Sequence, residues 1–223
     1  MTTKPRVAIL ISGRGANMAA LIEAAKKPGY PADIAFVLSN QSNAAGLKRA
    51  SAEGVATAVI DHSPFGTDRE SFERAIEAAL EAHKIDIVCL AGFMRLFSPW
   101  LVVRWSGRML NIHPALLPAF KGLHTHERAL AAGVKIHGAT VHFVVPEVDS
   151  GPIVAQAAVP VVNGDTAETL AARVLAVELK LYPLALALVA SGRATLAADG
   201  TVRTAAAPAP AAQLIVPDAN FPL

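Results

Sequence analysis

Hydrophobic and polar positions along the chain follow two alternating rhythms. Short apolar runs predict strands over 7–11, 34–39, 56–60, 87–90 and 109–113. Between them, apolar residues at helical spacing predict helices over 18–27 (capped by Asn17), 44–53 and 68–83, and a short helix that opens at Ser98-Pro99. Strands that alternate with helices predict a parallel sheet with helices on both faces.

The pattern changes in the second half of the chain. The elements expected there are a long loop over 114–124, a short helix, and two strands near 139–144 and 153–160. Asp165 and Glu168 have the spacing of a capping box, so a long helix should begin there and reach Pro183. The pair Asp199-Gly200 indicates a tight turn between two short strands.

These elements predict a single α/β domain over 1–204. Its expected fold is a doubly wound, mostly parallel, Rossmann-like sheet with a long C-terminal helix and a small antiparallel extension. No internal repeat or linker divides the chain. The stretch 205–212, Ala-Ala-Ala-Pro-Ala-Pro-Ala-Ala, is of low complexity, so we expect residues 205–223 to form a poorly ordered tail.

Composition narrows the class of protein. The 223 residues are 53% hydrophobic and 17% charged, as in globular proteins. The longest apolar run, 184–190, is far shorter than the roughly 20 residues of a membrane-spanning helix. A net charge of +2 without a basic stripe argues against a nucleic-acid partner. The single Cys89 lies in an apolar run and fits a reducing compartment, so we expect a cytoplasmic protein.

A glycine-rich loop connects the first strand and the first helix. Residues 12–17 read Ser-Gly-Arg-Gly-Ala-Asn. Glycines allow a sharp turn that exposes backbone N–H groups, and the helix N-terminus adds a positive dipole end, so the loop can hold a phosphate. It matches neither the dinucleotide-binding motif nor the P-loop. A tight turn without a ligand explains the loop nearly as well.

The most informative polar pair is Asn111 and His113, at the end of a strand predicted to be central. Residues two apart in a strand point to the same side, whereas Ile112 points to the opposite face. Open α/β sheets bind their ligands at the carboxyl ends of such strands. An amide and an imidazole there can stabilise an oxyanion and move a proton. A structural role for the pair is the alternative.

Five of the seven histidines fall between residues 113 and 142. His124 and His126 could chelate a metal ion, but the sequence has neither an H-E-x-x-H motif nor a cysteine cluster. We therefore expect a polar acid–base site without a metal. The turn over 146–152 contains Asp149, which could reach the histidines or belong to an ordinary solvated loop.

Together these motifs resemble the phosphoribosylglycinamide formyltransferase family (GAR transformylase, formyltransferase superfamily). The resemblance extends to about Pro183. It rests on Leu-Ile-Ser-Gly-x-Gly-x-Asn at 10–17, Ala-Gly-Phe-Met-Arg at 91–95, Asn-Ile-His-Pro-x-Leu-Leu-Pro at 111–118, Gly-Leu-His-Thr-His at 122–126 and Asp-x-Gly-Pro at 149–152.

The resemblance implies specific roles for residues. It implies transfer of a formyl group from 10-formyltetrahydrofolate, as co-substrate, to the amine of glycinamide ribonucleotide in purine synthesis. The implied catalytic residues are Asn111, His113 and Asp149. The implied ribonucleotide residues are Gly15, Ala16 and Asn17 for the phosphate and Glu178 for the ribose. The implied folate-binding residues are Arg69, Leu90, Met94, Arg95, Leu96, Phe97 and Asn111, with Arg69 and Arg95 meeting the glutamate carboxylates.

The implied mechanism agrees with the chemistry of these side chains. Attack of the amine on the formyl carbon gives a tetrahedral oxyanion, to which Asn111 and protonated His113 can donate hydrogen bonds. Asp149 would favour the imidazolium form of His113. His142 would support the catalytic residues without contacting the substrate itself. We expect only small-molecule partners, no membrane or nucleic acid, and a monomer or a homodimer.

Three other functions remain as alternatives. A methionyl-tRNA formyltransferase would carry a C-terminal β-barrel domain and a basic surface, whereas about forty residues follow Pro183 here. A formyltetrahydrofolate hydrolase usually has an N-terminal regulatory domain, whereas this chain starts directly on its first strand. A nucleotide-binding module without catalysis would leave Asn111, His113 and Asp149 unexplained.

Overall fold

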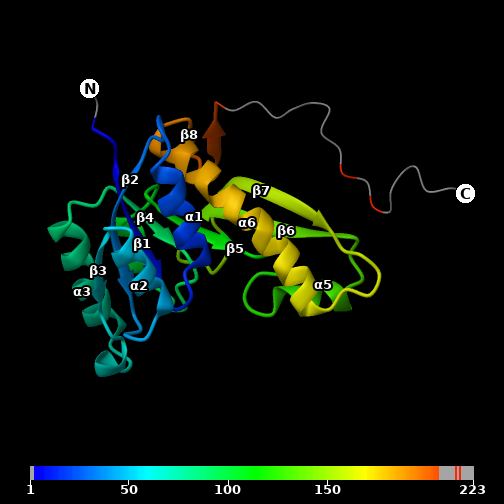
Figure 1. The fold of residues 1–223 in the computed structure, drawn as a ribbon, viewed down its shortest axis with the longest axis horizontal. Coiled ribbons are helices and arrows are strands. Elements are labelled where there is room, and N and C mark those ends of the chain that lie inside the picture. Colours follow the sequence, from blue (N-terminus) through cyan, green and yellow to red (C-terminus); the bar gives the residue numbers. More distant parts are fainter. Residues whose placement is uncertain (1–2, 206–213, 215, 217–223) are drawn as a thin grey trace, which may run out of the picture.

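A seven-stranded sheet forms the centre of the protein (Figure 1). The computed structural model describes residues 3–205, 214 and 216. The strands are β1 (Arg6–Ile11), β2 (Asp33–Ser39), β3 (Ala56–Val59), β4 (Ile87–Leu90), β5 (Met109–His113), β6 (Ile136–Phe143) and β7 (Ile153–Pro160). Their order is β3-β2-β1-β4-β5-β6-β7; the first five are parallel, and β6 and β7 are antiparallel to their neighbours. The expected doubly wound, mostly parallel fold is confirmed.

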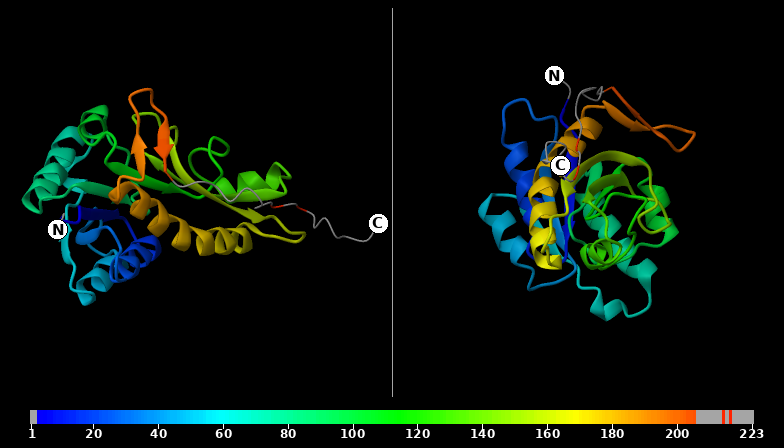
Figure 2. Two further views of the ribbon diagram at one scale, coloured as in Figure 1. Left: turned by 90° about the horizontal axis from the view of Figure 1, so that it is seen from above. Right: turned by 90° about the vertical axis from the view of Figure 1, so that its right-hand side faces the viewer.

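Helices cover both faces of this sheet (Figure 2). They are α1 (Ala16–Ala25), α2 (Ala45–Ala52), the 3-10 turn η1 (Ser63–Phe65), α3 (Arg69–Ala82), α4 (Pro99–Arg104), α5 (Thr125–Ala131) and α6 (Ala167–Ala190). α1, α2 and α6 pack on one face, and α3 and α4 pack on the other. The antiparallel strands β8 (Ala194–Leu196) and β9 (Val202–Thr204) form the expected small extension. Most of the expected tail, 205–223, lies outside the described residues.

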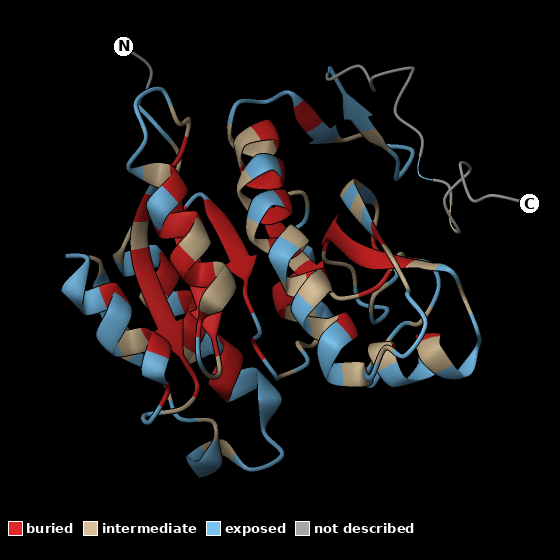
Figure 3. Ribbon diagram, turned by 45° about the vertical axis from the view of Figure 1, so that its right-hand side comes forward, coloured by how far each residue is buried: buried red, intermediate tan, exposed pale blue. Residues whose placement is uncertain are grey.

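Alternate side chains of the central strands pack into two separate hydrophobic cores, one on each face of the sheet. On β1, Val7, Ile9 and Ile11 face α1 and α6, whereas Ala8 and Leu10 face α3. All five are fully buried, which explains why the sequence of this strand is continuously apolar. Figure 3 shows the buried central strands between helices that are exposed on their outer sides. Among the described residues, no helix is both long and apolar enough to cross a membrane.

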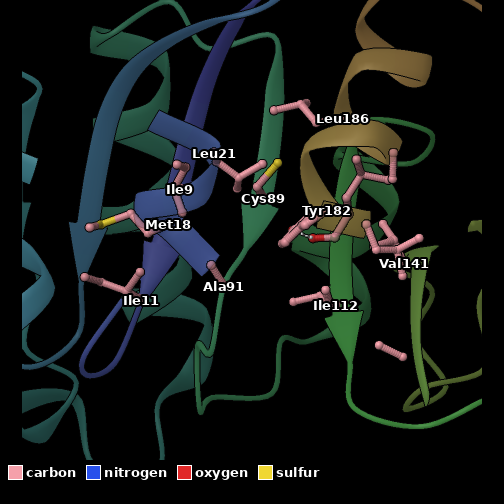
Figure 4. Close-up of a cluster of buried hydrophobic side chains, with 14 of the residues drawn as sticks. Ile9, Ile11, Met18, Leu21, Cys89, Ala91, Ile112, Val141, Tyr182 and Leu186 are labelled. Carbon is pink, nitrogen blue, oxygen red and sulfur yellow. Dashed lines mark hydrogen bonds between the residues drawn. The ribbon is translucent and has the colours of Figure 1, made fainter. Parts of the chain in front are cut away.

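Tyr182 fastens the long helix α6 to the centre of the sheet (Figure 4). Its side chain is fully buried, and its hydroxyl lies 3.1 Å from the backbone carbonyl oxygens of both Leu90 and Leu110. These carbonyls belong to β4 and β5, the two strands that lead into the predicted site. Cys89 is buried in the same cluster, and burial raises the pKa of its thiol to about 12, as expected of an inert core cysteine.

The starts of α1 and β6 differ from the sequence-based prediction. α1 is capped by Gly15, which has a φ of 71°, and not by Asn17, whose side chain instead bonds to Glu178. Glycine adopts this left-handed conformation without the steric cost of a side chain. β6 begins three residues earlier than expected and includes Gly138. A Cβ at Gly138 would lie 2.0 Å from the Ala157 carbonyl oxygen, so the glycine serves close strand packing and not a turn.

Helix α6 also differs from its prediction at both ends. Its N-cap is Thr166, which exchanges hydrogen bonds with Thr169, whereas Asp165 pairs with Arg173. The predicted cap of Asp165 and Glu168 was therefore off by one residue. The helix continues through Pro183 to Ala190, because buried apolar side chains on both sides of the proline pack against the sheet. Tertiary packing outweighs the lost backbone hydrogen bond.

Candidate active site

Most of the predicted site residues lie at one edge of the sheet, where the parallel strands end. The loop 12–17 follows β1, the segment 91–98 follows β4, and Asn111 and His113 are at the end of β5. β1 and β4 are neighbours, but β1 leads to a helix on one face and β4 to a helix on the other. This divergence makes the edge the switch point at which open α/β sheets bind ligands.

Asn111 is oriented by His142 on the adjacent strand. The two residues are paired across β5 and β6, with 3.3 Å between Asn111 Nδ2 and His142 Nε2. His142 Nδ1 lies 2.9 Å from the carbonyl oxygen of Phe143, so Nδ1 carries the proton and Nε2 accepts from the amide. Burial lowers the pKa of His142, which favours this neutral ring. One amide N–H of the half-buried Asn111 therefore remains for a ligand.

Buried His113 lies next to the largely buried carboxylate of Asp149. His113 Nδ1 lies 3.3 Å from Asp149 Oδ2, and its Nε2 lies 3.0 Å from the carbonyl oxygen of Phe120. Both partners are hydrogen-bond acceptors, so both contacts are satisfied only when both ring nitrogens carry protons. Asp149 Oδ2 also accepts from the Gly122 N–H at 2.8 Å, and its Oδ1 is 3.8 Å from His142 Nε2. The structure thus places an acceptor next to each ring nitrogen of His113.

A tight turn brings Asp149 to the histidines. Asp149 has a φ of 49°, a left-handed conformation that costs a non-glycine residue on the order of 1 kcal/mol but that aspartate tolerates better than most. Two residues later, a Cβ on Gly151 would lie 1.7 Å from the carbonyl oxygen of Phe143. Only glycine lets the turn approach β6 so closely. The structure therefore gathers Asn111, His113 and Asp149, although their catalytic roles stay a prediction.

The four residues predicted to bind the ribonucleotide also come together. Gly15 is the N-cap of α1, and Ala16 and Asn17 are its first two residues, whose N–H groups have no partner inside the helix. Asn17 Nδ2 donates to Glu178 Oε2 on α6 at 2.7 Å. Glu178 is only 8% exposed, and burial raises its pKa. An anion cradle and a carboxyl group that can accept from hydroxyls thus lie side by side.

The segment 91–98 presents apolar side chains beside this edge. Met94 is 64% exposed and Leu96 is 59% exposed, although both belong to a loop next to buried strands. Phe97 stacks on Phe93 with their ring centroids 5.3 Å apart, and Leu90 ends the buried β4. Exposed apolar side chains gathered at a strand end are typical of a surface that binds an apolar ring.

Arg69 and Arg95 line one small hollow. The other residues that line it are His62, Phe65, Gly66, Asp68, Phe72 and Leu96. Two guanidinium groups on one surface suit a ligand with several carboxylates. The structure therefore groups the predicted folate residues into an apolar part and a cationic part.

The remaining histidines do not form a metal site in the described part of the chain. The side chain of His124 is 75% exposed and pairs with Glu127, whereas the ring of His126 packs edge-on against buried His137. Burial lowers the pKa of His137 to about 4. Within residues 3–205, no three His, Cys, Asp or Glu side chains are arranged to hold an ion.

Metal removal provides a direct test of this interpretation. We expect exhaustive chelation to leave turnover unchanged, because the predicted catalytic residues, Asn111, His113 and Asp149, would act without a metal. The measurement is turnover before and after dialysis against a chelator, with metal content determined by elemental analysis. A loss of activity that zinc restores would instead assign His124 and His126 to a metal.

A larger hollow lies at the other edge of the sheet. It encloses about 320 Å³ and is lined by residues that include Glu77, Arg104, Trp105 and Arg108, next to the starts of β4 and β5. Arg104 contacts Glu77 there, and the Arg108 guanidinium stacks on Trp105. None of the predicted site residues lines this hollow, so it is separate from the candidate site.

Three contacts of the site were missed by sequence reasoning. They are the Phe120 carbonyl on His113, the hydrogen bond from Ser12 to Asn40, and buried Glu73, which holds Ser98 at the end of segment 91–98. Asn40 directly follows an apolar strand, just as Asn111 and His113 lie at the end of another. Polar residues at the end of every predicted parallel strand are therefore a signal that would have identified Asn40.

Residues 5–186 match the protein family described as formyl transferase. A crystal structure of phosphoribosylglycinamide formyltransferase from Brucella melitensis is 57% identical, with a TM-score of 0.81, and the match covers 85% of this chain and 97% of that one. The Escherichia coli K12 phosphoribosylglycinamide formyltransferase is 44% identical over 84% of this chain and 88% of its own length. The human trifunctional purine biosynthetic protein adenosine-3 is 51% identical over 89% of this chain, which spans only 20% of that protein.

The matched region contains the whole candidate site. Every predicted site residue, from Gly15 to Glu178, lies within residues 5–186. The similarity extends over most of both chains for the Brucella melitensis and Escherichia coli proteins, which share one name. This chain belongs to the formyl transferase family and, within it, to the phosphoribosylglycinamide formyltransferases.

Proposed function

We propose that this protein transfers the formyl group of 10-formyltetrahydrofolate to the amine of glycinamide ribonucleotide, a step of purine biosynthesis. The observation that carries the proposal is the position of Asn111, His113 and Asp149. Asn111 and His113 end β5, and Asp149 reaches His113 from the turn between β6 and β7. The neighbouring strands β4 and β1 end in the apolar segment 91–98 and in the phosphate loop. A formyl donor and a phosphorylated amine can therefore meet at the catalytic groups.

The reaction needs stabilisation of one oxyanion and movement of one proton. The amine nitrogen attacks the formyl carbon and forms a C–N bond; the C–N10 bond of the folate then breaks. The free amide N–H of Asn111 donates to the oxyanion, and each such donor is worth about 3 kcal/mol. We expect the second donor to be His113, which turns its Nε2 hydrogen bond from the Phe120 carbonyl to the more strongly accepting oxyanion. The proton leaves the amine and reaches N10 through His113 or water.

The two substrates suit the two sides of the site. On one side, the backbone N–H groups from Gly15 to Asn17 would hold the phosphate, and Glu178 would accept hydrogen bonds from the ribose hydroxyls. On the other side, Leu90, Met94, Leu96 and Phe97 would cover the pterin. Arg69 and Arg95 would meet the glutamate carboxylates of the folate.

The phosphate assignment is tested by Gly15→Val. Gly15 has a φ of 71°, and a Cβ there would lie 3.2 Å from Gly46 Cα, so valine would displace the cradle. We expect the Michaelis constant for the ribonucleotide to rise at least tenfold and that for the folate to change little. Initial rates at varied concentrations of each substrate provide both values. An unchanged ribonucleotide constant would mean that the phosphate binds elsewhere.

Transfer must be distinguished from hydrolysis of the formyl folate, the nearest alternative reaction. The experiment incubates the protein with 10-formyltetrahydrofolate, with and without glycinamide ribonucleotide, and follows the release of tetrahydrofolate. We expect release to require the ribonucleotide. Release at the same rate without it would instead indicate a hydrolase.

The proposal also covers the location, domain bounds, oligomeric state, metal requirement and partners of the protein. We propose a cytoplasmic enzyme with a formyltransferase domain over 1–204, a monomer or a homodimer, which requires no metal and whose partners are its two small-molecule substrates. The net charge of +2 supports a role that does not involve nucleic acid.

A further inference from the structure

One side chain, Ser12, links the two loops that flank the site. The backbone N–H of Met94 donates to Ser12 Oγ at 2.8 Å, and the Ser12 N–H donates to the Gly92 carbonyl at 3.0 Å. Ser12 therefore holds the start of the segment 91–98 through two hydrogen bonds. It is also the first residue of the loop 12–17, which is expected to hold the phosphate.

Asn40 accepts the hydrogen of the Ser12 hydroxyl group. Ser12 Oγ accepts from Met94, so its own hydrogen points to Asn40 Oδ1, 2.6 Å away. Asn40 is 1% exposed and directly follows β2, and its Nδ2 lies 3.1 Å from His62 Nδ1. The ends of β1, β2 and β4 are thus joined through one hydroxyl group whose donor and acceptor are both engaged.

The phosphate loop contacts α2 at the residue that follows Ser12. The carbonyl oxygen of Gly13 accepts from the Gly46 N–H at 3.1 Å, and a Cβ on Gly46 would lie 2.5 Å from Ile11 Cδ1. Gly13 is therefore held to α2, and Ser12 before it is held to Asn40 and Met94. A shift of Ser12 would be passed to the N–H groups of the cradle.

We infer that Ser12, held by Asn40, is a positioning residue shared by both substrate sites. It keeps the folate segment 91–98 at a fixed position relative to the phosphate loop. The inference rests on the proposed function, since it assigns one substrate to each loop. A hydroxyl group that merely supported the segment 91–98 would affect the folate alone.

The same segment has a second clamp at its far end, which supplies a matched control. Fully buried Glu73 on α3 accepts from the Ser98 N–H at 2.5 Å and from the Ser98 hydroxyl. Ser98→Ala removes one serine hydroxyl from the segment 91–98, as Ser12→Ala does, but at the end that is attached to α3. Its effect should be confined to the folate.

The experiment compares Michaelis constants for Ser12→Ala and Ser98→Ala, together with calorimetric titration of the ribonucleotide alone. Loss of one hydrogen bond changes affinity by roughly two- to tenfold. We expect Ser12→Ala to raise both Michaelis constants and the ribonucleotide dissociation constant within that range, with a smaller change in turnover. Ser98→Ala should raise the folate constant only.

Asn40→Ala provides a second variant, because it leaves Ser12 in place and removes its acceptor. We expect it to raise both constants, with a thermal melt showing that the protein is folded. If Ser12→Ala and Asn40→Ala change the folate constant alone, or neither constant, the shared role is wrong. That result differs from absence of transfer by the wild-type protein, which would overturn the proposed function itself.

Discussion

Replacing Asp149 with asparagine should lower turnover by roughly 10²- to 10⁴-fold, the range of a lost acid–base contribution, with little change in either Michaelis constant. Asparagine keeps the shape of the side chain but removes the negative charge 3.3 Å from His113 Nδ1. In the proposed mechanism, that carboxylate supports His113 as it donates to the developing oxyanion. An interaction made mainly in the transition state affects turnover and not substrate binding.

A double variant and a matched control make the result specific. His113→Asn combined with Asp149→Asn should lose less than the product of the two single effects, because the two residues act as a unit. Asp199 also accepts a backbone N–H in a turn, at 3.0 Å from Thr201, but lies beside the β8–β9 extension. Asp199→Asn should leave turnover unchanged. Near wild-type turnover for Asp149→Asn would show that Asp149 has only a structural role.

Gly151→Ala should have the second largest effect, on both stability and turnover. Its Cβ would lie 1.7 Å from the Phe143 carbonyl oxygen, and neither backbone segment can yield without moving the turn that holds Asp149. We expect a loss of roughly 3 kcal/mol in the free energy of unfolding, as for severe overpacking. A displacement of Asp149 by about 1 Å would lower turnover by roughly 100-fold.

Gly54→Ala is the control for this variant. Gly54 has a φ of 75° but open space around it, so alanine there costs only backbone strain of about 1 kcal/mol and should not affect turnover. Denaturant unfolding and initial rates give the two quantities for each protein. A Gly151→Ala protein with the stability and activity of the Gly54→Ala protein would contradict the tight approach of the turn to β6.

Local signals were sufficient for much of the fold. Helix α3 begins after Asp68, whose side chain accepts from the Ser71 N–H, and its apolar face of Phe72, Ile76 and Leu80 is buried as predicted. The prediction failed where a distant partner determines the conformation. Pro183 continues a helix because the sheet packs beneath it, and Gly138 lies within a strand because Ala157 approaches closely.

In the candidate site, too, residue patterns predicted local features correctly but not the features that depend on distant partners. The strand period of two placed Asn111 and His113 on one side of β5, and the structure agrees. Residue patterns alone could not bring Asp149 to His113, because the two are 36 positions apart and meet through a left-handed turn. That pairing came from the family resemblance. The Phe120 carbonyl and the Ser12–Asn40 link depend on loop geometry, for which the sequence carries no periodic signal.

Transfer of the formyl carbon itself tests the central claim most directly. The measurement supplies 10-formyltetrahydrofolate labelled with ¹³C in the formyl group, together with glycinamide ribonucleotide, and follows the label by NMR. The proposed function predicts that the label appears in the formamide of the ribonucleotide as tetrahydrofolate accumulates in equal amount. Label that appears as free formate, or that stays on the folate, would contradict it.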